Sequence, residues 1–180
     1  MTQQAEYWPG YKPEKLLEWW DDIQNVAKGD RATLRRCQTR KDIISQSAFY
    51  RFLNAVADQA LQESGDLLPL VAGLLAHVKD HVQDLSKKEC PIFLALGKSK
   101  KGRDLPVMSE LRFQNLLQSK DPDEFYQHMR RALALLDGKT DIIALIKVID
   151  DWVLQYQSDS SGTTLKQSIQ FKWAKAYYLH

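Results

Sequence analysis

The sequence predicts an all-α protein, a helical bundle in two packed subdomains. Apolar residues recur at intervals of three and four through most of the chain, which is the period of an amphipathic helix. The eight glycines and six prolines among 180 residues are few, and they lie between the periodic segments rather than within them. That placement favours helices over a strand-and-turn architecture. No segment of convincing length alternates apolar and polar residues as a half-exposed strand would.

The predicted helices follow from this periodicity and from their start and stop signals. A first helix over 13–27 has Pro13 in its first turn, a position that proline tolerates. A short cationic helix over 30–37 follows, with Gly29-Asp30 at its start, and a polar connector leads to Ser47. A short buried piece is expected over 90–96. The remaining helices are expected over 48–64, 66–82, 109–117, 121–138, 140–156 and 164–179.

One stretch interrupts this pattern. Residues 97–104, GKSKKGRD, place four cationic side chains among two glycines directly after the apolar run CPIFLAL. Such a composition is typical of a mobile loop between packed elements. We therefore expect a single domain over 1–180, with helical subdomains of about 1–96 and 105–180 joined by this basic loop.

The cationic residues are concentrated rather than spread evenly. The formal net charge is only +2, yet residues 28–51 contain seven lysines and arginines against two aspartates, a local balance of +5. Residues 97–117 and 164–180 each add a balance of +3, and the segments between are acidic. Basic blocks of this kind could fold into one stripe that follows a phosphate backbone. They could also be the ordinary solvated faces of helices.

Candidate catalytic groups are few. His77 and His81 lie four residues apart in the predicted helix 66–82, a spacing that suits a metal ion, and Asp84 could add an oxygen ligand. The metalloprotease motif needs a glutamate where Val78 stands, and no third strong ligand cluster appears. The adjacent pair Asp150-Asp151 would point about 100° apart on a helix and is interpreted as surface charge. We therefore predict a protein that is not an enzyme, with no cofactor and no metal.

The two cysteines and the hydropathy indicate where the protein works. Cys37 and Cys90 form no CxxC motif and fit a reduced, cytoplasmic protein. The N-terminus lacks the basic region and apolar run of a signal peptide. The longest apolar run, 67–78, is too short to span a bilayer. We expect a cytoplasmic protein with no membrane partner.

Six short segments occur in an order that resembles a known family. They are GDRATLRRC (29–37), FYRFL (49–53), LPLVAGLLA (68–76), LPVMSELRFQNLL (105–117), MRRALALL (129–136) and WAKAYY (173–178). Each is a short helical pattern, and the ordered set is far more specific than any member. The set resembles the CasB family, the small subunit of the type I-E CRISPR complex Cascade.

The resemblance implies a helical protein of two subdomains without catalytic activity. Two copies would lie head to tail in the complex, beside the backbone and large subunits and the crRNA. There they would hold target DNA, particularly the displaced single strand. By resemblance, the basic role passes to Arg31, Arg35, Arg36, Arg51 and Arg112. On charge alone, we add Lys98, Lys100, Lys101, Arg103, Arg130 and Arg131 as nucleic-acid-binding residues.

Three other functions remain open on the sequence. A helical protein–protein adaptor could use the same basic faces to meet acidic partners, with no direct nucleic-acid contact. A helix-turn-helix regulator of duplex DNA would need a recognition-helix pair, and none stands out. A hydrolytic enzyme would have to use His77 and His81.

Overall fold

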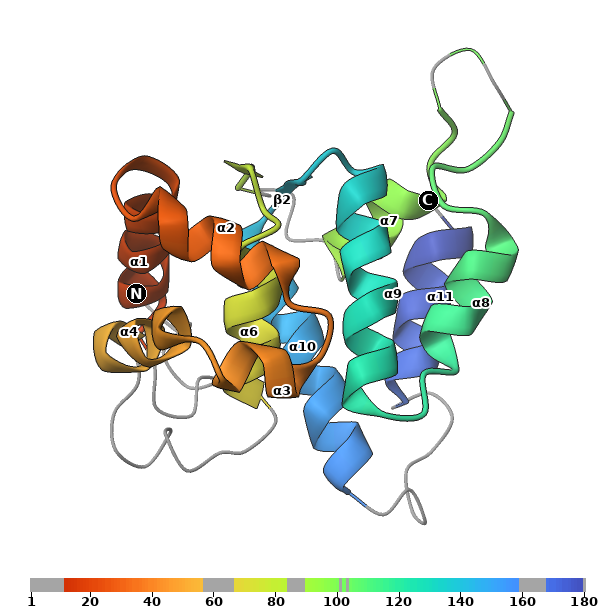
Figure 1. Cartoon of the computed structure of the whole chain (residues 1–180). Coiled ribbons are helices and arrows are strands. Elements are labelled where there is room, and N and C mark those ends of the chain that lie inside the picture. Colours follow the sequence, from red (N-terminus) through yellow and green to blue (C-terminus); the bar gives the residue numbers. More distant parts are fainter. Residues whose placement is uncertain are drawn as a thin grey trace, which may run out of the picture. The chain divides into compact units, whose positions relative to one another are not determined.

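The chain is predominantly helical, as predicted (Figure 1). The computed structural model describes residues 12–56, 67–83, 90–100, 102, 104–158 and 168–179. The chain divides into two compact units, Met1–Ala76 and His77–His180. This division falls earlier in the chain than the loop 97–104, where we expected a subdomain boundary, and that boundary stays a prediction.

The first unit is built around a short apolar helix. Its helices are α1 (Pro13–Asn25), α2 (Lys28–Arg36), α3 (Arg40–Ile44), α4 (Ser47–Val56) and α6 (Leu67–Leu75). Every residue of α6 is buried, and α2, α3 and α4 all contact it. A helix that is apolar on all sides has to be enclosed by other elements, so α6 forms the core of this unit.

The helix α3 lies inside the segment that we expected to be a polar connector. Thr39 and Asp42 form a capping box: the Thr39 hydroxyl accepts from the Asp42 backbone N–H, and the Asp42 carboxylate accepts from the Thr39 N–H at 2.9 Å. These bonds satisfy backbone donors at the start of a very short helix. The fully buried Ile43 then holds α3 against the unit. The segment expected as a polar connector therefore contains a short helix that was not predicted.

The second unit has an aromatic core. Its elements are β1 (Asp80–His81), α7 (Pro91–Gly97), α8 (Glu110–Leu117), α9 (Pro122–Leu135), β2 (Lys139–Thr140), α10 (Ile142–Gln157) and α11 (Ile169–Tyr178). Trp173 of α11 stacks on Phe93 of α7 with ring centres 4.6 Å apart, and Phe125 of α9 stacks on Trp152 of α10 at 4.5 Å. Aromatic stacking therefore joins four helices around one core.

The predicted helix 66–82 is too long. The helix α6 ends at Leu75, and the chain then forms β1, which pairs in parallel with β2 so that Asp80 lies opposite Lys139. The carbonyl of Gly138, at a φ of 72°, accepts the Lys79 N–H at 2.8 Å. This pairing uses backbone groups that a longer helix would need, and it joins segments far apart in sequence.

The other predicted helices agree with the structure in position, with small differences at their ends. The first helix ends at Asn25 rather than at residue 27, and α9 ends at Leu135 rather than at residue 138. Parts of three predicted helices, residues 57–64, 66 and 164–167, lie outside the described residues, as does the candidate metal ligand Asp84. Within the described residues, no helix is long and apolar enough to cross a membrane.

Candidate nucleic-acid interface

The helix α2 presents the strongest concentration of cationic side chains in the first unit. It buries a single residue, Leu34, and it exposes Arg35 and Arg36 in its last turn. Cations are favoured there because the helix macrodipole makes the C-terminal end negative. Asp30 lies in the first turn, where a carboxylate is favoured for the same reason. The charge pattern predicted for 30–37 therefore matches a real helix with an exposed cationic end.

Arg31 is engaged inside the first unit. Its Nε donates to the carbonyl oxygen of Ala76 at 3.2 Å, at the C-terminal end of α6. Burial, and then the neighbouring charge of Arg35, lower the pKa of Arg31. The guanidinium therefore satisfies a helix-end carbonyl.

Arg51 forms a two-bond ion pair with Asp30 of α2. Its Nε and Nη2 donate to the two carboxylate oxygens of Asp30 at 2.6 and 2.5 Å. The Arg51 side chain is 57% exposed, whereas the Asp30 side chain is 17% exposed. The hydrogen bond from Arg51 to Asp30 raises the pKa of Arg51. The structure thus brings Arg51 to α2 through a carboxylate that the sequence prediction had left unpaired.

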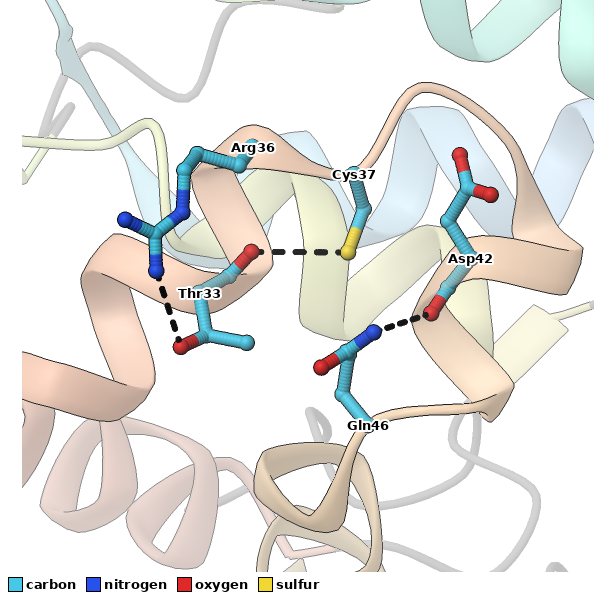
Figure 2. A pocket seen from close by; sticks show the side chains of 5 residues that line it. All are labelled: Thr33, Arg36, Cys37, Asp42 and Gln46. Atoms are coloured by element: carbon cyan, nitrogen blue, oxygen red, sulfur yellow. Dashed lines mark hydrogen bonds between the residues drawn. The ribbon is translucent and has the colours of Figure 1, made fainter.

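A shallow pocket lies beside Arg36 (Figure 2). Its volume is about 290 Å³. The Arg36 guanidinium lies 3.5 Å from the Thr33 hydroxyl, and the Gln46 amide donates to the Asp42 carbonyl. Backbone N–H groups of residues 38 and 39 lower the pKa of Asp42. The remaining lining residue, Cys37, donates its thiol to the Thr33 carbonyl. Most polar groups of the pocket are therefore bonded within the unit, and Arg36 is the cation at its edge.

The described residues that flank the outer part of the basic loop 97–104 pair with each other as in a hairpin (Figure 1). Ser99 pairs with Pro106 in an antiparallel bridge, and the Lys100 N–H donates to the Leu105 carbonyl at 3.0 Å. Lys98 and Lys100 are exposed on this hairpin. Lys101 and Arg103 lie outside the described residues.

The remaining predicted residues lie on α8 and α9. Arg112 and Arg131 are exposed. Arg130 is half-buried, and its guanidinium carbon lies 5.4 Å from the ring centre of the buried Tyr126, within the range of a cation–π contact. Arg31, Arg35, Arg36 and Arg51 belong to the first unit, and the other predicted residues belong to the second. That the two sets form one stripe stays a prediction.

His77 and His81 do not lie on one helix, so the predicted i, i+4 arrangement of the two side chains is not formed. His77 lies in a turn and His81 lies in β1. The Nδ1 of His81 accepts the Ile142 N–H at 3.2 Å, and the Asp141 carboxylate accepts the Ile143 N–H at 2.8 Å. His81 therefore satisfies a backbone donor at the start of α10. Across the part of the chain that the structure describes, no three His, Cys, Asp or Glu residues are grouped to hold a metal ion.

The interpretation of Asp150-Asp151 as surface charge was wrong for the first residue. Asp150 is 6% exposed, whereas Asp151 pairs with Lys147 at 3.4 Å. Burial, and then the charge of Asp151, raise the pKa of Asp150. The ionised form is therefore less favourable in the folded protein than in the unfolded chain.

Replacement of this carboxylate gives a pH-dependent prediction. Asp150→Asn is expected to raise the melting temperature near pH 7, because it removes a buried carboxyl group whose ionised form is disfavoured by folding. As pH falls through the raised pKa, Asp150 takes up a proton in the folded state and the wild type regains that stability. The advantage of the variant should therefore shrink toward about pH 4. Thermal melts over this range check it, with Asp104→Asn, at an exposed aspartate of the same unit, as the control; an advantage that grows on acidification would contradict it.

These observations define a class of protein. The chain is a small helical protein with arginines and lysines exposed on ordered helices and on a projecting hairpin, a pattern that suits contact with an anionic partner. The family model described as CRISPR-associated protein Cse2 matches residues 30–178, and the chain belongs to this family. Members are the small subunit of the type I-E Cascade complex, a structural and generally non-catalytic component that assembles with other subunits. The search of curated proteins found no match, and neither did the search of solved structures.

Proposed function

We propose that this subunit braces the crRNA-bearing backbone of Cascade and binds target DNA, chiefly the displaced single strand, to stabilise the R-loop in antiviral defence. The observation that supports it most is the exposed pair Arg35 and Arg36 on an ordered helix within the +5 segment 28–51. Further cations would come from Lys98, Lys100 and Arg112. The complex would act in the cytoplasm, with the large subunit and a second copy of this chain as further partners.

The energetics of strand exchange make such a role effective. The RNA–DNA hybrid that forms is about as stable as the DNA duplex that it replaces, so modest protein contacts can shift the balance. Contacts to phosphates need no reading of base sequence, only cations at fixed positions. Arginine suits this task because its planar fork can bind phosphate through two hydrogen bonds.

Charge reversal on α2 tests the proposal. For about four engaged phosphates, the affinity for single-stranded DNA should fall with salt at a log–log slope of about −3, at ~0.7 per phosphate. The double variant Arg35→Glu/Arg36→Glu is expected to weaken binding at least tenfold at low salt and to reduce the slope by at least 1.4 or so, because two phosphate contacts are lost. Titrations of a labelled oligothymidine across a salt series measure both quantities.

The matched control reverses two cations elsewhere in the first unit, Lys12→Glu/Lys15→Glu, and should leave the slope close to the wild-type value. The second readout is R-loop formation by the reconstituted complex. If the α2 variant forms and holds R-loops as the wild type does, the DNA-binding role is wrong. A protein–protein adaptor would then be the better function, and subunit pull-downs that survive nuclease treatment would support it.

A further inference from the structure

Arg51 and Arg31, both proposed as DNA ligands on the sequence, bind groups outside their own helices. Arg51 donates to both carboxylate oxygens of Asp30, and Arg31 donates to the carbonyl of Ala76. We infer that Arg51, through Asp30, is a positioning residue that fixes α2 against α4, and that phosphate contact belongs to Arg35 and Arg36. The assignment of phosphate contact rests on the proposed function. The fixation of α2 by the Asp30–Arg51 pair does not.

The ion pair occupies the groups that Arg51 would need for a phosphate. Two nitrogens of its planar fork are used by the two oxygens of one carboxylate. A phosphate contact in the same geometry would break the pair and leave Asp30, whose side chain is only 17% exposed, without this cation. The freed carboxylate would also repel the phosphate. The charges of Asp30 and Arg51 therefore nearly cancel, so the pair has little net attraction for an anionic DNA strand.

The helix α2 needs polar contacts to hold it in place, because it buries little apolar surface. Leu34 is its one buried residue, and a helix of nine residues is not stable alone. A single apolar side chain leaves the rotation of a helix about its own axis poorly fixed. Asp30 in the first turn binds α4, and Arg31 binds the end of α6, so two polar contacts fix that rotation from two neighbouring helices.

The rotation of α2 about its axis determines the directions in which Arg35 and Arg36 point. Both follow Leu34 in sequence, so they lie about 100° and 200° around the helix from the buried side chain. Any rotation of α2 would turn one of them toward the core and the other away from its solvent-facing position. The Asp30–Arg51 pair thus orients Arg35 and Arg36, whose side chains are exposed.

Four variants of the full chain separate positioning from contact: Arg51→Gln, Asp30→Asn, the exchanged pair Asp30→Arg/Arg51→Asp, and Arg36→Gln for comparison. Each is measured for melting temperature and for oligothymidine affinity across a salt series. Arg51→Gln and Asp30→Asn should each lower the melting temperature by about 2–4 °C, and the exchanged pair should recover most of that loss. Arg51→Gln should weaken binding severalfold with an unchanged salt slope, whereas Arg36→Gln should reduce the slope by about 0.7.

The exchanged pair gives the decisive result. Recovery of both affinity and melting temperature with an aspartate at position 51 supports positioning, because a direct phosphate ligand cannot be replaced by a carboxylate. A reduced slope in Arg51→Gln, with no recovery of affinity in the exchanged pair, would overturn the inference. If the wild type itself binds no oligothymidine, the proposed function fails, and the melting temperatures alone decide whether the pair anchors α2. Failure of the exchanged pair to recover stability would then overturn the anchoring.

Discussion

Gly97→Ala is expected to lower the free energy of unfolding by about 3 kcal/mol, because it adds a methyl group where two helix backbones touch. Gly97 ends α7, which packs on α11, and a Cβ there would overlap the carbonyl oxygen of Tyr177, with the carbonyl carbon at 2.9 Å. Backbone atoms cannot rotate away as the end of a long side chain can, so α7 and α11 must separate. Chemical denaturation followed by circular dichroism and by tryptophan fluorescence measures the loss.

Gly29→Ala is the matched control. A Cβ at Gly29 meets nothing within 4 Å, and the residue lies in α2. Alanine is a better helix former than glycine, so this variant should be more stable than the wild type by about 0.5–1 kcal/mol. A Gly97→Ala protein that is as stable as the wild type would show that α7 and α11 do not approach this closely.

Trp173→Ala is expected to cost about 3–5 kcal/mol of stability, the range measured for removal of a large aromatic side chain from a core. Trp173 is 1% exposed, and its ring stacks on Phe93 at 4.6 Å and on Phe125 at 6.3 Å. The variant loses both ring contacts and leaves a cavity between α7, α9 and α11. Near-ultraviolet circular dichroism should lose aromatic signal together with the fall in melting temperature.

The control for this variant lies on the same helix. Phe171 is 42% exposed, and Phe171→Ala should change stability by no more than about 0.5 kcal/mol. Equal losses in the two variants would mean that the aromatic core of the second unit is not centred on Trp173.

The helices that the sequence predicted well are those whose apolar face is regular. The helices α9 and α10 also have aspartate caps, Asp121 and Asp141, which accept backbone N–H bonds as their positions suggested. The predictions were wrong where an interaction other than the apolar periodicity determines the local structure. The helix α3 depends on a capping box, Thr39 with Asp42, over too few residues to show periodicity. The predicted helix 66–82 was too long because the pairing of β1 with β2 joins residues about sixty positions apart.

The candidate site was predictable in its charge but not in its contacts. Exposure of Arg35 and Arg36 follows from their positions about 100° and 200° around the helix from Leu34, the one buried residue of α2. The bond between Arg51 and Asp30 spans 21 positions, and no local pattern in the sequence reports such a pair. Burial of Asp150 was missed because both aspartates were interpreted as surface charge, although Asp150 is 6% exposed and Asp151 pairs with Lys147.

The hairpin that holds Lys98 and Lys100 is closed at its base by backbone bonds, including those of Val107 to Lys98 and Met108 to Leu96 at 3.0 Å. Its attachment to the second unit therefore does not depend on which side chains its outer part bears. Lengthening a loop whose ends are already fixed costs little, since the closure entropy grows only with the logarithm of its length. Number and spacing of cations in this hairpin can thus vary among related chains while the helices beneath keep their packing.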